Sequence, residues 1–598
     1  MRGMPAAPAS WSSREPGTSE RTWLRGTPWA SLGHLDVEAL AARYSRVVVV
    51  AAHPDDETLA VGAFLAMLAD AGLAVDVALV TDGEGSHSAA TGLTFEVVRE
   101  VRRREFDDAL GVLLGGALGR VERLALPDGR VADHRAELAA ALERVVRVTA
   151  AGASTVSDQS PSRAVGCDDA ATDVTSTVAP SMTPVRGSGT ERVLVVAPAE
   201  ADAHIDHDTC GAVARDVAAQ LGAACVSYPL WWWHWGDPSS VAETVWERSV
   251  LAVPDVASLQ RKREAIAAYS SQIGTFARPA AEPAMLDAGV LAHFERLVET
   301  LFDPDGALPR VASSDDGRTP AASFDAMFEG SDDPWGVETR WYERRRRALI
   351  EAMLPDEHLG RVLDLGCSTG VLTQVLAERA DGVVAVDGSA QALARARRRD
   401  VDGVDWRHAE LPSVLDELAD EGQRFDTVVL SEIGYFLDGA TLLATLAGID
   451  ALLRDDGVVV VANWLHPTRD IPLDGRLVDE QVRLVWPTLA RYEDDDVAIV
   501  VARPSNGDAP TAATAPCRAT PAPSCESRPH RRILSTPAIF VHIRRLTASA
   551  ALEPSAAKVP EMTSKERPHD SACRRGDASQ PALRRVLRSH RPRADGRS

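Results

Sequence analysis

The chain has 598 residues, of which 45% are hydrophobic and 25% charged, and its formal net charge is -23 at pH 7. The length is several times that of a typical domain and the composition is ordinary for globular proteins, so we expect two large domains with flexible additions. The acidic balance argues against nucleic acid as the main partner, because phosphate binding needs a basic surface. None of the seven cysteines forms a Cys-x-x-Cys pair, which argues against a disulfide framework or a cysteine zinc site.

Three stretches of low complexity punctuate the chain. Residues 1–36 are predicted to form a flexible N-terminal arm, 151–190 a disordered insert, and 504–598 a disordered tail. From residue 505 onward the tail carries 17 Lys and Arg against 8 Asp and Glu, and is therefore basic. No apolar run approaches the roughly 18 to 20 residues that span a bilayer, and the start lacks the apolar core of a secretory signal. We expect a cytoplasmic protein, and the sequence leaves its oligomeric state open.

The first domain is expected at residues 37–300, where strand-like runs alternate with helical patterns. Such alternation is typical of parallel βαβ units. The strand-like runs are 46–52, 74–80, 121–126 and 192–198, and the helical patterns are 58–71, 95–114, 134–149 and 208–221. A further strand at 224–230 precedes the tryptophan-rich segment Trp231–Trp235. Core packing is favoured for that segment over a sugar-stacking platform.

Two clusters of histidine and aspartate follow strands of this domain. His53-Pro54-Asp55-Asp56-Glu57 comes directly after the first strand, and His204-Ile205-Asp206-His207 follows the fourth after a short acidic loop. If both strands belong to one parallel sheet, their carboxyl ends meet where open α/β sheets bind ligands. Imidazole and carboxylate groups suit zinc, which keeps a position for water in catalytic sites.

Residues 47–272 resemble the PIG-L/LmbE-like zinc deacetylases, which remove N-acetyl groups from amino sugars. The resemblance rests on the two clusters, with support from Thr81-Asp82-Gly83-Glu84-Gly85, Arg104-Glu105-Phe106, Ala109-Leu110-Gly111, Leu126-Pro127-Asp128-Gly129 and Lys262 through Gln272, which fits the family's terminal helix.

The resemblance implies a role for each residue of the two clusters. His53, Asp56 and His207 would bind Zn²⁺, and Asp55 would be the general base that activates water. His204 would face the developing oxyanion, and Asp206 would orient a histidine. The chain departs from some relatives in having Asp202, where they have a tyrosine.

A second domain is expected at residues 324–503, after a linker at 301–323. The strand 361–365 runs into a glycine loop, Gly366-Cys367-Ser368-Thr369-Gly370, and Asp387 follows the next strand. That acid lies 21 residues beyond Gly366, near the spacing at which an acid meets a ribose in nucleotide-binding βαβ units. We therefore expect an α/β protein with two Rossmann-like three-layer domains and mostly parallel sheets.

Residues 330–503 resemble the class I S-adenosylmethionine-dependent methyltransferases, and specifically the NodS-like N-methyltransferases. The NodS-like features are Asp333-Pro334-Trp335, Trp341-Tyr342-Glu343 and a glycine loop in which Ser368 replaces the usual middle glycine. By this resemblance the methionine part of S-adenosylmethionine lies against Asp364 and the loop Gly366, Cys367 to Gly370, the ribose against Asp387, and the adenine against Ala409 and Glu410. Candidate bases for the acceptor are Glu432, Tyr435 and His466.

The two domains together suggest a bifunctional enzyme. A deacetylase exposes an amine, and an N-methyltransferase consumes one, so we expect an N-acetylated amino sugar or its conjugate as the small-molecule substrate. Two alternatives stay open. The first domain could be a sugar-binding module without hydrolytic activity, or the protein could be a scaffold in a glycan-assembly complex, with the insert and the tail as docking elements.

Overall fold

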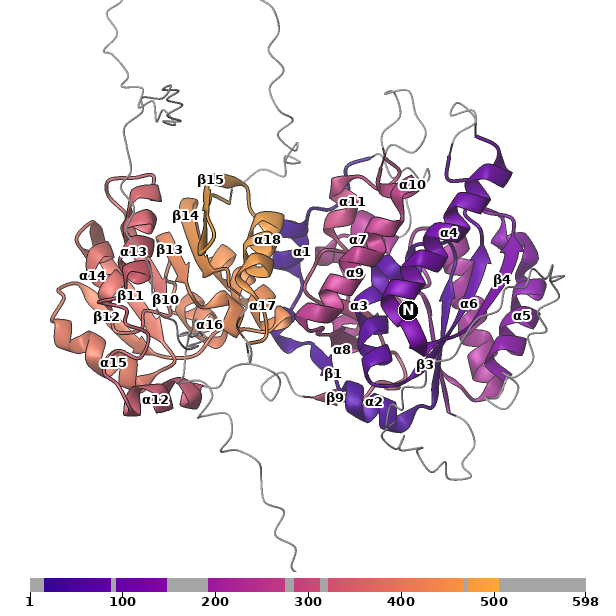
Figure 1. Ribbon diagram of the computed structural model, residues 1–598, viewed down its shortest axis with the longest axis horizontal. Coiled ribbons are helices and arrows are strands. Elements are labelled where there is room, and N and C mark those ends of the chain that lie inside the picture. Colours follow the sequence, from indigo (N-terminus) through magenta and orange to yellow (C-terminus); the bar gives the residue numbers. More distant parts are fainter. Residues whose placement is uncertain are drawn as a thin grey trace, which may run out of the picture. The chain divides into compact units, whose positions relative to one another are not determined.

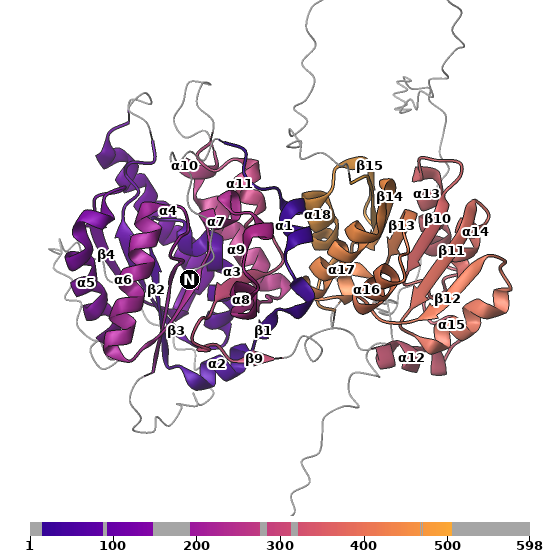
Figure 2. The ribbon, with the colours of Figure 1, turned by 180° about the vertical axis from the view of Figure 1, so that it is seen from behind.

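The computed structural model describes residues 15–87, 93–147, 192–274, 284–311, 321–466, 468 and 471–504. They form two sheets, each between layers of helices (Figures 1 and 2), which confirms the expected α/β class with two Rossmann-like domains. The predicted insert and tail lie outside the described residues, apart from Pro504. Among the described helices, none is both long and apolar enough to cross a membrane.

The first sheet has nine strands in the order β4-β3-β2-β5-β6-β8-β7-β1-β9. The run from β4 to β6 is parallel, whereas β8 is antiparallel to both its neighbours and β9 is antiparallel to β1. The strands are β1 (Gly33–Leu35), β2 (Arg46–Ala51), β3 (Ala74–Thr81), β4 (Leu118–Leu126), β5 (Val193–Pro198), β6 (Ala224–Tyr228), β7 (Ser249–Ala252), β8 (Glu299–Phe302) and β9 (Arg310–Val311).

Helices cover both faces of this sheet because its central strands are apolar on both sides. Val47 and Val49 of β2 pack in the core formed with α3 and α4, whereas Val48 and Val50 pack with α5 and α6. The helices are α1 (Glu20–Gly26), α2 (Val37–Arg43), α3 (Asp56–Asp70), α4 (Phe95–Leu114), α5 (Arg135–Arg147), α6 (Ile205–Leu221), α7 (Trp231–Trp235), α8 (Glu243–Glu247), α9 (Val256–Ala268), α10 (Ser270–Ile273) and α11 (Ala288–Ala292).

The N-terminal segment differs from the flexible arm expected at residues 1–36. From residue 15 onward it contains α1 and β1, and Trp23 is fully buried against the ring of Trp232, with 4.8 Å between ring centroids. Trp23 also donates its indole N–H to the carbonyl of Trp233 at 2.6 Å. Apolar side chains within a polar, proline-rich stretch therefore anchor the segment. Trp231, Trp232 and Trp233 are buried, so the preference for core packing is confirmed.

Two strands lie just outside the predicted boundaries of the first domain, one before its start and one after its end. Strand β1 precedes residue 37, and β9 lies at 310–311, inside the predicted linker 301–323. These two short strands pair with each other at the edge of the first sheet. Their few residues give too little periodicity to be recognised without their partners.

A buried ion pair between Glu299 and Lys262 stabilises an irregular turn inside α3. Val61 has a non-helical backbone (φ -137°, ψ 19°), and the Glu299 carboxylate accepts the amides of Ala63 at 2.9 Å and Phe64 at 2.7 Å. Lys262 lies 2.7 Å from the same carboxylate. The predicted helix from Lys262 to Gln272 ends at Ala268 and resumes as the short helix α10.

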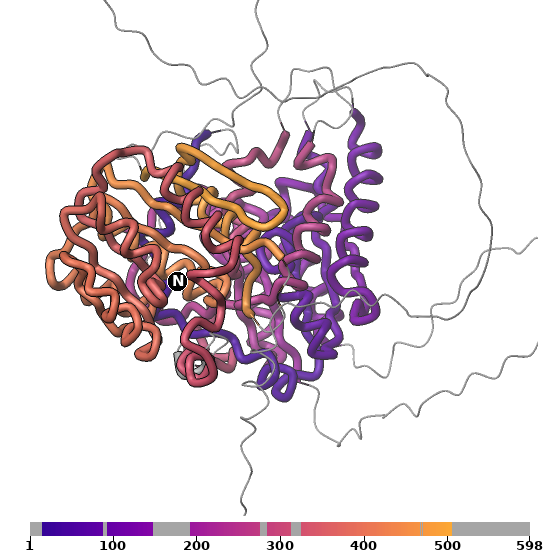
Figure 3. The backbone as a smooth tube through the Cα atoms, turned by 60° about the vertical axis from the view of Figure 1, so that its left-hand side comes forward, coloured from indigo at the N-terminus to yellow at the C-terminus, as the bar shows by residue number. Residues whose placement is uncertain are grey.

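The second sheet has seven strands in the order β12-β11-β10-β13-β14-β16-β15, in which only β16 runs against the others and is antiparallel to both its neighbours (Figure 3, where the last strands are orange to yellow). The strands are β10 (Gly360–Leu365), β11 (Ala380–Asp387), β12 (Val404–His408), β13 (Phe425–Ser431), β14 (Leu453–Trp464), β15 (Thr488–Glu493) and β16 (Val497–Ala502). The helices are α12 (Ala321–Glu329), α13 (Trp341–Met353), α14 (Val371–Ala377), α15 (Ala390–Ala396), α16 (Ser413–Asp420), α17 (Gly439–Leu452) and α18 (Gly475–Val485). Short 3₁₀ turns at Trp29–Ser31, Gly115–Ala117, Val131–His134, Pro238–Ser240, Arg397–Arg399 and Gly434–Phe436 complete the elements.

Replacing Glu299 with alanine should lower the free energy of unfolding by about 3–5 kcal/mol, because it leaves the Lys262 charge and two amides buried without a partner. Denaturation of the full chain followed by tryptophan fluorescence measures this loss. Glu264→Ala, at an exposed position of α9, is the control and should change stability by less than about 0.5 kcal/mol. Equal effects of the two substitutions would contradict this role.

Candidate functional sites

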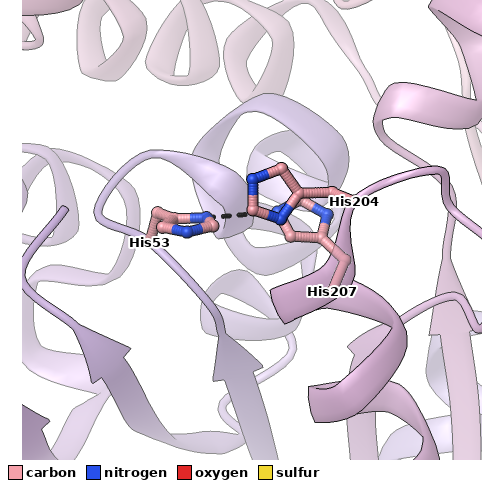
Figure 4. Close-up of side chains that lie close together, drawn as sticks. All are labelled: His53, His204 and His207. Atoms are coloured by element: carbon pink, nitrogen blue, oxygen red, sulfur yellow. Dashed lines mark hydrogen bonds between the residues drawn. The ribbon is translucent and has the colours of Figure 1, made fainter. Parts of the chain in front are cut away.

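The two histidine and aspartate clusters meet at the carboxyl edge of the first sheet. Strands β2 and β5 are parallel neighbours with Val49 opposite Val196, so the segments that follow them emerge side by side. His53 lies in the turn after β2, whereas His204 and His207 lie at the start of α6 (Figure 4). The sequence-based expectation that both clusters share one location is therefore met by the fold.

Three donor atoms converge within this cluster. His53 Nδ1 lies 3.2 Å from His207 Nε2, and Asp56 Oδ2 lies 3.5 Å from the first nitrogen and 3.3 Å from the second. Ligands held about 2.0–2.1 Å from a tetrahedral zinc ion are about 3.3 Å apart. The spacing of the three atoms therefore fits a zinc ion.

Carboxylates fix which nitrogen of each imidazole faces this position. His207 Nδ1 lies 2.7 Å from Asp202 Oδ2, and His53 Nε2 lies 3.2 Å from Asp128 Oδ1 and 3.3 Å from Asp206 Oδ2. When each imidazole is neutral, its proton lies on the nitrogen that faces the carboxylate, and the other nitrogen has a free lone pair for a metal ion. The two lone pairs belong to the two nitrogens that converge.

Asp202 is the residue that sequence reasoning misjudged. We noted it only as a departure from a tyrosine, but besides holding His207 it accepts the backbone amides of Leu230, Trp231 and Trp232 at 2.7–3.0 Å. Asp206, which was expected to orient a histidine, contacts His53 and accepts the amides of Gly129 and Val131. Asp202 lies in the short acidic loop between the fourth strand and the second cluster, where the sequence gave no signal of these contacts.

The electrostatic potential at the cluster is negative. Burial alone would lower the pKa of His207, but Asp56 and Asp202 raise it to about 9. The pKa of His53 is also raised despite burial, by Asp128, Asp206 and Asp56. A potential that favours imidazolium ions also favours a metal cation.

Asp55 lies beside these donors in a strained conformation. Its φ is 124°, which non-glycine residues rarely adopt, and such strain is concentrated at functional sites. Burial raises the pKa of Asp55 to about 7, although the Arg102 guanidinium, whose Nη2 is 3.0 Å from its carboxylate, opposes the rise. Arg102 also donates to the carbonyls of Pro54 and Gly83. Sequence reasoning missed Arg102, which lies within a run of three arginines.

His204 is a neutral imidazole at the amino end of α6. Burial and the neighbouring His207 and His53 lower its pKa to about 3. Its Nδ1 accepts the Asp206 amide at 3.2 Å, so Nε2 carries the proton and is a hydrogen-bond donor. The ring centroid lies 4.8 Å from those of both His53 and His207.

The supporting motifs of the first domain hold its loops together. Asp82 forms a two-point ion pair with Arg103, with both N–O distances at 2.7 Å. Glu105 accepts hydrogen bonds from Ser270 and Ser271, which connects α4 to α10. These contacts give Glu105 a structural role.

The glycine loop of the second sheet follows β10. Gly366 and Gly370 have φ values of +77° and +76°, and a Cβ at Gly366 would lie 2.1 Å from Ile433. The Ser368 and Thr369 hydroxyls are buried and have no hydrogen-bond partner among the described residues. Cys367 is buried beside them. The crowded backbone and the unpaired hydroxyls fit a loop that holds a polar cofactor.

Acids flank this loop on the neighbouring strands. Asp364 is buried on β10 and accepts the Thr373 hydroxyl at 2.6 Å, and burial raises its pKa to about 6. Asp387, at the end of β11, accepts the amides of Ser368 and Ser389, each at 2.8 Å. Ala409 and Glu410 follow β12 directly, and the Ala409 amide donates to the Asp387 carbonyl at 3.2 Å. The candidate cofactor residues therefore gather at one edge.

The three candidate bases are not equivalent. Glu432 and Tyr435 hydrogen-bond to each other after β13, with 2.5 Å between their oxygens. His466 is exposed and lies 2.8 Å from the Asp496 carboxylate. The position of His466 on the surface makes it the weakest of the three.

Comparison with known proteins matches one segment of each domain to a family model. Residues 48–218 match the profile of PIG-L, described as GlcNAc-PI de-N-acetylase, and residues 328–465 match that of Nodulation protein S (NodS). Nodulation protein S of Azorhizobium caulinodans is 30% identical over 145 residues, which are 23% of this chain and 67% of the relative. An uncharacterized methyltransferase of Mycobacterium tuberculosis is 34% identical over 141 residues, 23% of this chain and 64% of the relative.

The chain therefore covers about two thirds of the length of each of these curated relatives. Among solved structures, N-methyltransferase NodS from Bradyrhizobium japonicum WM9, in complex with S-adenosyl-l-homocysteine, is 19% identical. The match covers 30% of this chain and 98% of that one, with a TM-score of 0.28.

Asp202→Asn should weaken zinc binding by about 10–100-fold, because the amide no longer fixes the lone pair of His207 on Nε2. Competition with a chromogenic chelator measures the affinity without any need for turnover. Asp216→Asn, at an exposed position of α6, the helix that carries His207, is the matched control and should bind zinc as the unmodified chain does. Undiminished affinity in Asp202→Asn would contradict the orienting role.

Asp387→Ala should reduce the affinity for S-adenosylhomocysteine at least about tenfold, because it removes the acid facing the expected ribose position and the acceptor that holds the Ser368 amide. Titration calorimetry of the full chain measures the affinity. Asp381→Ala, at an exposed position of the same strand, is the control. Unchanged binding in Asp387→Ala would exclude the residue from the cofactor site.

Proposed function

We propose that this chain, which belongs to the NodS family through residues 328–465 and carries a PIG-L domain at residues 48–218, is a bifunctional enzyme. The first domain removes the acetyl group from an N-acetylated amino sugar or its conjugate with the help of zinc. The second transfers a methyl group from S-adenosylmethionine to an amine. The observation that carries the first activity is the convergence of His53, Asp56 and His207 beside the strained Asp55.

His53 Nδ1, Asp56 Oδ2 and His207 Nε2 would hold the zinc ion. When bound there, zinc supplies Lewis acidity, which polarises a carbonyl and acidifies water. Asp55 takes a proton from the attacking water and returns it to the leaving nitrogen, so water and amide become acetate and amine. Arg102 keeps the Asp55 carboxylate in place, and the Nε2–H of His204 donates to the carbonyl oxygen as negative charge develops on it.

Methyl transfer depends mainly on how the cofactor and the acceptor are positioned relative to each other. Asp364 and the loop from Gly366 to Gly370 hold the methionine part of the cofactor, Asp387 the ribose, and Ala409 and Glu410 the adenine. The acceptor nitrogen attacks the sulfonium methyl in line, and most of the acceleration comes from holding the two partners at close range. A product of the first reaction has the free amine that the second reaction needs.

The test of both activities is incubation of the full chain with zinc, labelled S-adenosylmethionine and a panel of N-acetylglucosamine conjugates, followed by mass spectrometry. We expect loss of an acetyl group followed by gain of a methyl group on the same molecule. Methyl gain with the acetyl group retained would instead favour a methyltransferase with a sugar-binding module. A scaffold would show neither reaction.

Asp55→Asn should slow acetate release by about 10²–10⁴-fold, because the amide cannot accept the proton of water. Methylation of an already deacetylated acceptor should be unchanged in the same variant. Asp70→Asn, an exposed change at the end of α3, is the control for acetate release. Full hydrolytic activity in Asp55→Asn would remove this residue from the mechanism.

A further inference from the structure

Glu432 occupies a strained position at the carboxyl end of β13. Its φ is +65°, which a non-glycine residue adopts only when the surrounding structure enforces it. Strand β13 pairs with β10 with Leu430 opposite Leu365, and Ile433 lies directly against Gly366 of the glycine loop. The fold thus holds a glutamate beside the proposed cofactor loop, at the edge where parallel sheets bind ligands.

The carboxylate of Glu432 has two phenols as its hydrogen-bond partners. Tyr342 donates to Oε1 at 2.9 Å, and Tyr435 donates to Oε2 at 2.5 Å. A carboxylate has about four acceptor positions, so two remain for another donor. About 18% of the Glu432 side chain is exposed, which leaves the group reachable from solvent.

The negative charge of Glu432 is incompletely balanced. Arg346 is the nearest cation, but it donates to Glu343 and Ser431, and its Nε lies 3.9 Å from Glu432. That Nε is buried without a hydrogen-bond partner among the described residues. Two carboxylates therefore share one guanidinium, and burial raises the pKa of Glu432 although Arg346 opposes the rise. The ionised form of such a partly buried carboxylate is costly unless a cation joins it.

The phenol that holds Oε1 of Glu432 packs against a further aromatic ring. Tyr342 meets the ring of Trp464 edge to face, with 4.6 Å between centroids, and Trp464, at the end of β14, is partly exposed. Rings attract an ammonium group through their negative faces. A carboxylate with two spare acceptor positions among aromatic rings matches the N–H donors and positive charge of an alkylammonium, whereas a neutral hydroxyl offers a single donor and no charge.

We propose that Glu432, oriented by Tyr342 and Tyr435, receives the amino group of the methyl acceptor and removes a proton from it before methyl transfer. This inference rests on the proposed methyl transfer to an amine and restricts that acceptor to a primary or secondary amine, which has a proton to lose. The ammonium gives one proton to the Glu432 carboxylate and becomes a neutral amine. Its lone pair then forms the N–C bond while the S–C bond breaks, which yields S-adenosylhomocysteine and a methylated ammonium. Release of the Glu432 proton to water completes the cycle.

The test compares the full chain with Glu432→Gln, using octyl 2-amino-2-deoxy-β-D-glucopyranoside as the probe and octyl β-D-glucopyranoside as the hydroxyl analogue. In Glu432→Gln we expect the affinity for the amine, measured by calorimetry with S-adenosylhomocysteine bound, to fall at least about tenfold. We expect kcat for methyl transfer to fall about 10²-fold or more. The affinity for S-adenosylhomocysteine itself should stay within about twofold, which separates this role from a structural one. Glu417→Gln, the same change at an exposed position of α16, should leave all three quantities unchanged.

A second variant keeps the test decisive if Glu432→Gln does not fold. Tyr342→Phe retains the ring and removes one hydroxyl, and should weaken amine binding about 3–10-fold with unchanged cofactor affinity. Amine methylation that is equally fast in the unmodified chain and in a folded Glu432→Gln, or Tyr342→Phe, would overturn the inference and leave the proposed methyltransferase standing. Transfer of methyl to the hydroxyl analogue but not to the amine would overturn the amine assignment. An unmodified chain that methylates neither probe would count against the proposed function itself.

Discussion

The parallel pairing of β2 with β5 is the constraint on which the proposed metal site depends. Val49 lies opposite Val196 in this pair, so the turn containing His53 and the amino end of α6 start from the same edge. Because side chains alternate along a strand, a shift of one residue would reverse which valines face each layer of helices. Burial on both faces therefore fixes the register of the strands, and this register determines where the histidines lie.

The proposed sites of the two sheets lie at the carboxyl edges of their parallel strands and suit ligands of different charge. In the first, several carboxylates surround the imidazoles, and the potential favours a cation. In the second, buried hydroxyls and a crowded glycine loop lie between Asp364 and Asp387, an arrangement suited to a large polar molecule. The chemistry therefore follows from the residues after each strand, whereas the location follows from the fold.

The contacts around the proposed zinc position extend into the core. Asp202 connects His207 to the amides at the start of α7, and the tryptophans of that helix pack with Trp23 from the N-terminal segment. Only hydrogen-bonded partners on every side make so buried a carboxylate tolerable. The tryptophan-rich segment, for which core packing was preferred to a sugar platform, thus supports the loop that orients His207, a proposed zinc ligand.

The sequence by itself determined the α/β class, the alternation of strands and helices, and the two families, because strand periodicity and short motifs are local. Through the resemblance to the PIG-L/LmbE-like family it also predicted His53, Asp56 and His207 as a set of ligands. Only the tertiary structure determined the contacts between residues that lie far apart in the sequence, because a local sequence pattern does not contain them. Asp202 and Arg102 acquire their roles only through contacts with residues distant in sequence, and Trp23 turns a stretch that reads as flexible into part of the core. Side-chain partners across a fold depend on register and packing, which a single sequence does not display.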